Sequence, residues 1–189
     1  MSVQVSHEIP LSLIDEHQDF ISDYMFVLLH KILEDEQYAN TVLDFSDHGE
    51  IIYLDNSCFE LGESLDNKLL YEWYQRIEPE YVVLPDVLGD YRRTLQRSIE
   101  FADNYPEAIP NGMPVIQGST PDEMIDCYNE FINYSDKWGM RQSKILSFTC
   151  LVILATVLRL LRLPSLGFLF GFEAFFPLDT LHFRSYLGG

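Results

Sequence analysis

The chain has 189 residues, of which 47% are hydrophobic and 14% aromatic, and its formal net charge is −18. This length supports one domain with a sizeable core and is too short for two ordinary ones, while the apolar content excludes a disordered chain. Residues 1–140 hold 7 Lys/Arg and 28 Asp/Glu, and so acidic a segment excludes simple electrostatic binding to a phosphate backbone unless basic residues cluster locally.

Short apolar runs alternate with helical patterns through the first two-thirds of the chain. Strands are predicted at residues 24–30, 51–55, 81–86 and 113–117. Helices are predicted at about 34–45, from an N-cap at Ser64 to Ile77, from a cap at Asp90 to Ala102, and from Thr120 to Ile132, where Thr120-Pro121-Asp122-Glu123 reads as a capping box. The order predicts four βα units, which is typical of either a (β/α) barrel or a doubly wound sheet.

The sequence changes character near residue 140, where the βα rhythm stops. Residues 145–158 carry no charge, and the segment 141–189 holds 5 Lys/Arg against 2 Asp/Glu. One interpretation is a membrane span, although the uncharged run is shorter than the roughly 20 residues that a bilayer core requires. Other interpretations are a buried helix followed by an aromatic loop, or a tail that is not the natural continuation of the domain, such as a translated frame change.

Polar residues follow three of the predicted strands at the point where each ends. Asp55 closes the run 51–55, Asp86 closes 81–86, and Gln117 closes 113–117. The carboxyl ends of parallel strands meet at one edge of a sheet, and this is the edge where ligands bind in parallel α/β folds. The sequence therefore predicts a shared site for Asp55, Asp86 and Gln117.

Three motifs carry a resemblance to a known family. They are Asp55-Asn56-Ser57-Cys58-Phe59-Glu60-Leu61-Gly62, Leu84-Pro85-Asp86-Val87-Leu88-Gly89-Asp90 with Thr94, and Val115-Ile116-Gln117-Gly118. In order and spacing they resemble tRNA-guanine transglycosylases (queuine tRNA-ribosyltransferases), and most of all the phage branch related to enzymes that insert 7-deazaguanine into DNA. The resemblance covers about residues 8–136 and implies the first half of a TIM-type (β/α)8 barrel over residues 1–140, with an atypical apolar, helical or irregular tail over 141–189.

The resemblance also implies roles for individual residues. By position, Asp55 matches the family's acid/base Asp beside the bound base, and Asn56 and Ser57 would line the same loop. Asp86 matches the Asp that recognises the amino and ring N–H edge of guanine, and Gln117 with Gly118 matches contacts to the base's carbonyl. A carboxylate facing N–H donors and an amide facing a carbonyl would reject bases that lack those groups.

The chain departs from the family pattern in its last third. The family's covalent nucleophile is a second Asp at a late strand, followed in many members by a zinc site. After residue 136 the sequence offers only Asp179, and no strand pattern leads to it. The resemblance thus implies a truncated and inactive member of a pentosyltransferase family, with no zinc or other cofactor, whose partners would be a purine or deazaguanine base and tRNA or DNA. A half barrel with open edges also predicts poor solubility or a homodimer.

Two other functions stay open at this point. A metal-assisted barrel hydrolase would use His30 at the tip of the first strand with Asp55 and Asp86, and a non-enzymatic protein would use its apolar tail to bind a membrane or partner. Arg92, Arg93 and Arg97 form either a solvated helix face or a phosphate contact. Cys58, Cys127 and Cys150 fit no disulfide framework or zinc spacing, and residues 1–8 do not read as a secretory signal, so a cytoplasmic protein is predicted. The resemblance to the phage branch implies a bacterial or phage-infected cell.

Overall fold

A four-stranded parallel sheet forms the centre of the molecule. The structure is a computed structural model, and it describes residues 4–5, 24–139 and 174–175. The strands are β2 (Met25–Leu28), β3 (Ile52–Asp55), β4 (Tyr81–Val83) and β5 (Gly112–Met113), hydrogen-bonded in that order. A separate antiparallel pair joins β1 (Gln4–Val5) to β6 (Ala174–Phe175). The alternation of strands and helices confirms the mixed α/β prediction for the residues described, and the predicted tail lies almost entirely outside them.

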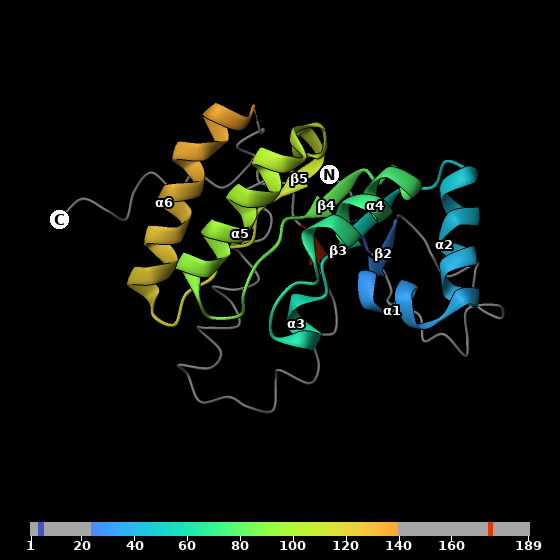
Figure 1. Cartoon of the computed structure of the whole chain (residues 1–189), viewed down its shortest axis with the longest axis horizontal. Coiled ribbons are helices and arrows are strands. Elements are labelled where there is room, and N and C mark those ends of the chain that lie inside the picture. Colours follow the sequence, from blue (N-terminus) through green and yellow to red (C-terminus); the bar gives the residue numbers. More distant parts are fainter. Residues whose placement is uncertain (1–3, 6–23, 140–173, 176–189) are drawn as a thin grey trace.

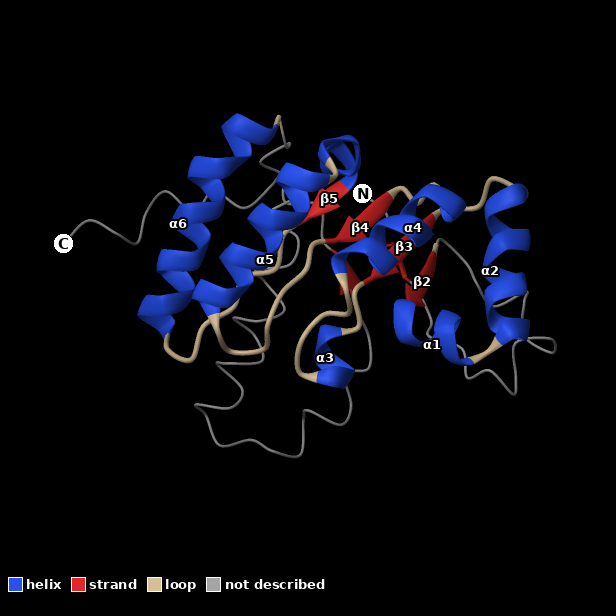
Figure 2. Ribbon diagram, viewed as in Figure 1, coloured by secondary structure: helices blue, strands red, loops and turns tan. Residues whose placement is uncertain are grey.

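Helices connect successive strands (Figures 1 and 2). They are α1 (Leu29–Glu34), α2 (Glu36–Asp47), α3 (Cys58–Leu61), α4 (Asn67–Ile77), α5 (Tyr91–Asn104) and α6 (Pro121–Trp138), together with the 3₁₀ helix η3 (Pro106–Asn111). The short α3 projects past the carboxyl edge of the sheet, the lower edge in Figure 1. None of the helices in the described ranges is long and apolar enough to cross a membrane.

Alternate strand residues point to opposite faces, and each face has its own core. On one face, which we call the helix face, Val27, Leu54 and Val82 pack with Leu70 of α4 and Phe101 of α5. On the other face a cluster of strand and strand-flanking residues is buried, and no residue of a described helix belongs to it. Its members are Tyr24, Phe26, Leu28, Tyr53, Val83, Met113 and Val115, with Tyr81 packed against them.

The helix caps confirm two of the predicted starts. Asp90 accepts the Arg93 N–H, and Thr120 accepts the Glu123 N–H at 3.2 Å. The Glu123 carboxylate reaches back to the Ser119 N–H at 2.7 Å, one residue before the cap. These contacts fix the chain just after β4 and just before α6.

Several predicted boundaries are wrong, and each has a local cause. Two strands end early because Pro85 and Pro114 cannot donate to a ladder: β4 ends at Val83 and β5 at Met113. The α4 cap is Asp66, which accepts N–H bonds from Lys68 and Leu69, whereas Ser64 is buried in the preceding loop.

The first strand also ends before its predicted limit. Strand β2 stops at Leu28, and the chain turns directly into α1. His30 is therefore the second residue of a helix and does not lie at a strand tip.

Candidate functional site

Four polar side chains are buried at the carboxyl edge of the sheet. Asn56 and Ser57 follow β3, Asp86 follows β4 and Gln117 follows β5, and none is more than 8% exposed. Burial of polar groups is unfavourable unless they are hydrogen-bonded, so their contacts decide what this edge can do.

The Asp86 carboxylate links the loops that follow β3, β4 and β5. Asn56 Nδ2 donates to Asp86 Oδ1 at 2.8 Å, and Gln117 Nε2 donates to Asp86 Oδ2 at 2.6 Å. We call Asn56, Asp86 and Gln117 the carboxylate–amide cluster. The structure thus brings Asp86 and Gln117 together, as the sequence predicted, and adds Asn56 as a second direct partner of Asp86.

Backbone contacts hold both amides in one orientation. Asn56 Nδ2 also donates to the Leu84 carbonyl at 2.7 Å, while Asn56 Oδ1 accepts the Cys58 N–H at 2.8 Å. Gln117 Oε1 accepts the Gly89 N–H at 3.0 Å. Because each amide oxygen is already bonded to an N–H, each NH₂ group is directed at the carboxylate.

Burial changes the acidity of the groups in this region. Desolvation raises the pKa of Asp86 above its ordinary value, although hydrogen bonds from Gln117, Asn56 and Cys58 oppose the shift. Burial, followed by the nearby Asp86 carboxylate, raises the pKa of the Cys58 thiol. Cys58 is therefore a neutral thiol at neutral pH and a poor nucleophile.

Asp55 and Ser57 form a tight local turn next to the cluster. The Asp55 Oδ2 accepts the Ser57 N–H at 2.7 Å, and Ser57 Oγ accepts the His30 N–H at 3.0 Å. Ser57 adopts the left-handed conformation with φ 63°, which is unfavourable for a residue with a side chain and is often found at functional sites. Asp55 is half-buried and is the last residue of β3. It therefore lies directly before Asn56, where the loop begins.

Gly118 lies just before α6, and its backbone packs very closely against the first turn of that helix. A Cβ at this position would lie 2.7 Å from the Met124 nitrogen and 3.0 Å from the Glu123 carbonyl carbon. Those are backbone atoms of a helix, so they cannot move aside easily. A glycine is required here by packing, whether or not its backbone also contacts a ligand.

Sequence reasoning missed two hydroxyl groups of α5, which we call the clamp, that hold the loop after β4 in place. Thr94, fully buried on α5, accepts the Val87 N–H at 3.0 Å and donates to the Val87 carbonyl at 3.1 Å. Ser98, one turn later, donates to the Pro85 carbonyl at 2.7 Å. Two hydroxyls spaced by four residues on one helix face were the signal in the sequence.

The arginines of α5 (Arg92, Arg93 and Arg97) mainly make contacts within the protein. Arg93 pairs with Glu63 at 2.7 Å, and Arg97 donates to the carbonyls of Ser64 and Leu65 at 2.9 and 2.7 Å. The Arg92 guanidinium lies over the Tyr91 ring, 5.6 Å from its centroid. This arrangement favours the solvated-face interpretation over a preformed phosphate site.

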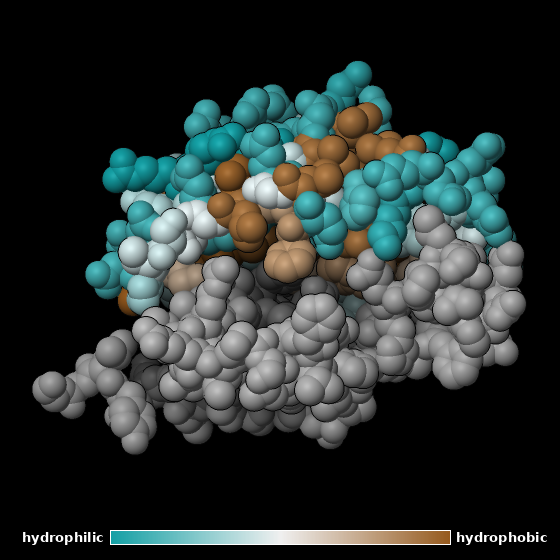
Figure 3. Space-filling view, turned by 90° about the horizontal axis from the view of Figure 1, so that it is seen from below, coloured by the Kyte–Doolittle hydropathy of each residue, from teal (hydrophilic) through white to brown (hydrophobic). Residues whose placement is uncertain are grey.

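The carboxyl edge also exposes apolar side chains. Phe59 on α3 is 81% exposed, and Leu61 and Leu88 are about half exposed. The two loops that hold them are joined, since Leu88 N donates to the Gly62 carbonyl at 3.0 Å. Figure 3, which views the molecule from below, shows hydrophobic residues grouped between hydrophilic ones on this side.

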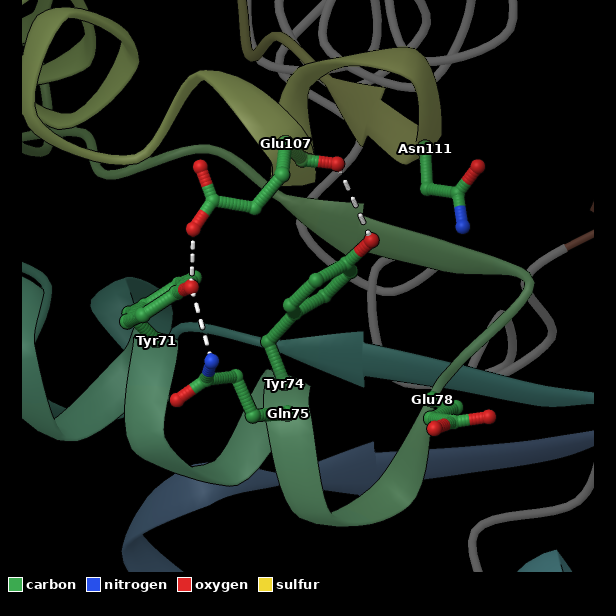
Figure 4. A pocket seen from close by; sticks show the side chains of 6 residues that line it. All are labelled: Tyr71, Tyr74, Gln75, Glu78, Glu107 and Asn111. Atoms are coloured by element: carbon green, nitrogen blue, oxygen red, sulfur yellow. Dashed lines mark hydrogen bonds between the residues drawn. The ribbon is translucent and has the colours of Figure 1, made fainter.

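A polar hollow lies at the opposite, amino edge of the sheet (Figure 4). It encloses about 460 Å³ and is lined by Tyr71, Tyr74, Gln75, Glu78, Glu107 and Asn111. The Tyr71 hydroxyl donates to the Glu107 carboxylate, and the Tyr74 hydroxyl donates to the Glu107 carbonyl at 3.4 Å. The hollow's groups are thus largely bonded to one another.

The described residues contain no group of three His, Cys, Asp or Glu side chains arranged to hold a metal ion. His30, Asp55 and Asp86 are all described, and they do not form such a group. Asp179 lies outside the described residues. No protein-family model matches the chain, and comparisons with curated proteins and with solved structures find no match either.

Proposed function

We propose that this chain is a transglycosylase-like protein that binds guanine or a 7-deazaguanine at the carboxyl edge of a half barrel. The observation that supports this proposal is the buried Asp86 carboxylate, which is held between the amides of Asn56 and Gln117. The two NH₂ groups hold the carboxylate in a fixed orientation, as recognition of a flat, hydrogen-bonding ligand requires.

The sheet topology supports a barrel rather than a doubly wound sheet. Strand order follows chain order from β2 to β5, and helices α1, α2, α4, α5 and η3 contribute to the core on the helix face. A doubly wound sheet reverses its strand order at a switch point and carries helices on both faces. The second face, rich in Tyr, Phe and Val, has the bulky residues expected of a barrel interior.

The chemistry of the cluster suits a guanine edge. Each carboxylate oxygen can accept more than one hydrogen bond, so an ionised Asp86 retains capacity for the ring N–H and the amino group of guanine. The amide of Gln117 and the backbone at Gly118 would face the base carbonyl. The exposed Phe59 ring, four residues after Asp55, offers a flat apolar surface near the same loop.

Base binding and base exchange are separate parts of the proposal. Asp55 would be the acid/base group, with Asn56 and Ser57 shaping its loop. Exchange at a glycosidic bond in tRNA or DNA also needs a nucleophile. Among the described residues, no Asp at a late strand matches the family's covalent nucleophile. The function that we propose for the described residues is therefore base binding.

Calorimetry on the full chain tests this proposal. We expect 7-deazaguanine and guanine to bind, adenine to bind at least about 10-fold more weakly, and Asp86→Asn to remove guanine binding, because the variant presents a donor to a donor. Asp103→Asn, the same substitution at an exposed position of α5, is the matched control. Far-UV circular dichroism verifies that each variant is folded.

Two results would contradict the proposal. One is a wild-type chain that binds none of these purines. The other is a folded Asp86→Asn variant with wild-type affinity for guanine.

A further inference from the structure

Three buried side-chain atoms in the described part of the chain have no hydrogen-bond partner: His30 Nδ1, Ser64 Oγ and Trp138 Nε1. The first two lie at the carboxyl edge. His30 follows β2, and Ser64 belongs to a loop whose N–H donates to the Asp86 carbonyl at 3.0 Å. Trp138 ends α6, which runs away from this edge (Figure 1). Since a buried polar atom without a partner is unfavourable, orphaned atoms near the cluster indicate a missing ligand or water.

His30 is fixed beside the Asp55 loop by the backbone. Leu28 is the register partner of Asp55 in the parallel pair β2–β3, and His30 is two residues further on. The His30 N–H donates to Ser57 Oγ at 3.0 Å, and the Ser57 N–H donates to Asp55 Oδ2 at 2.7 Å. The strained Ser57 thus connects the backbone of His30 to the Asp55 carboxylate, although no contact ties down the His30 ring nitrogen Nδ1.

The strand order sets the distance between His30 and the base-binding cluster. Along the carboxyl edge the order is His30 after β2, Asp55 on β3, Asp86 after β4 and Gln117 after β5. Neighbouring strands lie about 4.8 Å apart, so β2 and β4 are about 10 Å apart. A base bound at Asp86 that extends toward β2 therefore places its attached sugar near His30.

We infer that His30 is a specificity residue that hydrogen-bonds a sugar hydroxyl when the ligand is a purine nucleoside. The inference rests on the proposed function and adds the part of the substrate that the carboxylate–amide cluster does not reach. A neutral imidazole nitrogen can donate to or accept from a hydroxyl, depending on its tautomer. His30 then distinguishes a nucleoside from a free base, whereas Asp86 distinguishes guanine from other bases.

The test compares ligands that share one base. The full chain is titrated by calorimetry with 7-deazaguanine and with 7-deazaguanosine, for the wild type, His30→Ala and His30→Asn. We expect His30→Ala to weaken nucleoside binding by about 3- to 10-fold with free-base affinity unchanged, which is the loss of one hydrogen bond. His30→Asn keeps an amide near the position of Nδ1 and should recover most of the loss.

The matched control is His48→Ala, which removes an exposed histidine bonded to the Asp44 carbonyl at 2.7 Å. Nitrogen-15 NMR of the His30 ring supplies an independent readout in the wild type. The Nδ1 resonance should shift on addition of the nucleoside and stay in place on addition of the base.

The outcomes separate this inference from the proposed function. Normal base binding with an unchanged nucleoside-to-base affinity ratio in His30→Ala overturns the role of His30 and leaves the cluster's role intact. An Nδ1 resonance that responds to neither ligand shows that no ligand contacts this nitrogen, and it overturns the role of His30 as well. A wild type that binds neither ligand overturns both proposals.

Discussion

The two edges of the sheet each hold a carboxylate in a network of hydrogen bonds, but the networks differ in burial. At the carboxyl edge Asp86 is 2% exposed and is held by Asn56 and Gln117. At the amino edge Glu107 is exposed and is held by Tyr71. Burial raises the pKa of Asp86, whereas the Tyr71 hydroxyl lowers the pKa of Glu107. Solvent access thus decides whether a bonded carboxylate is unfavourable or favourable in its charged form.

The comparison also separates a site from a surface contact. A buried carboxylate that keeps its hydrogen bonds in the absence of ligand is energetically significant, because losing one partner leaves the others unsatisfied. An exposed carboxylate loses its partner to water at little cost. The largest effects of mutation are therefore expected at the carboxyl edge.

Asp86→Ala should lower the free energy of unfolding by about 2–4 kcal/mol, because it leaves the amide donors of Asn56 and Gln117 unsatisfied beside a small cavity. Urea denaturation of the full chain measures this change. Glu107→Ala is the comparison variant and should leave the denaturation midpoint nearly unchanged. Equal destabilisation by the two variants would remove the distinction between the edges.

Thr94→Val should lower the free energy of unfolding by about 1–3 kcal/mol, because the buried Val87 N–H and carbonyl both lose their partner on α5. Thr94→Ser keeps the hydroxyl and should retain most of the stability, apart from the contribution of one methyl group. Thermal melts of both variants sharpen the comparison by showing how much the loop after β4 depends on its clamp. Similar melting temperatures for the two variants would contradict the clamp.

The raised pKa of Asp86 makes stability depend on pH in a defined direction. The folded state binds this proton more tightly than the unfolded state, so the contribution is fully present below the ordinary value of 3.8 and is lost as the pH rises through the folded pKa. We expect the stability difference between the wild type and Asp86→Asn to fall over this window and then become constant. Chemical denaturation from pH 3 to pH 8 measures it, and a difference that is independent of pH would contradict the shift.

Tyr71→Phe should raise the pKa of Glu107 toward its ordinary value, because the donor that stabilises the carboxylate is removed. Carbon-13 NMR titration of the Glu107 carboxyl carbon measures this smallest effect. Tyr74→Phe is the control, since the Tyr74 hydroxyl donates to the Glu107 backbone carbonyl and not to its carboxylate. A pKa that is the same in Tyr71→Phe and the wild type would show that the exposed contact is not formed in solution.

The sequence predicted the polar strand ends well because their order follows from parallel topology. Asp86 and Gln117 follow the strands of adjacent βα units, so a parallel sheet brings them to one edge. It could not predict that Asn56 would donate to Asp86 and Leu84 together, because that contact depends on how the β3 loop turns at Ser57. The early ends of β4 and β5 were readable from Pro85 and Pro114, and the true α4 cap at Asp66 competed with an equally suitable Ser64.

The neighbour-to-neighbour strand order has a consequence for how the chain is made. Within the central sheet each strand pairs with the strand that precedes it by about 30 residues, as in Met25 with Ile52 and Val82 with Gly112. Low contact order of this kind permits fast assembly, and a nascent polypeptide leaving the ribosome could add one strand at a time. The pairing of Gln4 with Phe175 is the exception, and it can form only after residue 175 has been synthesised.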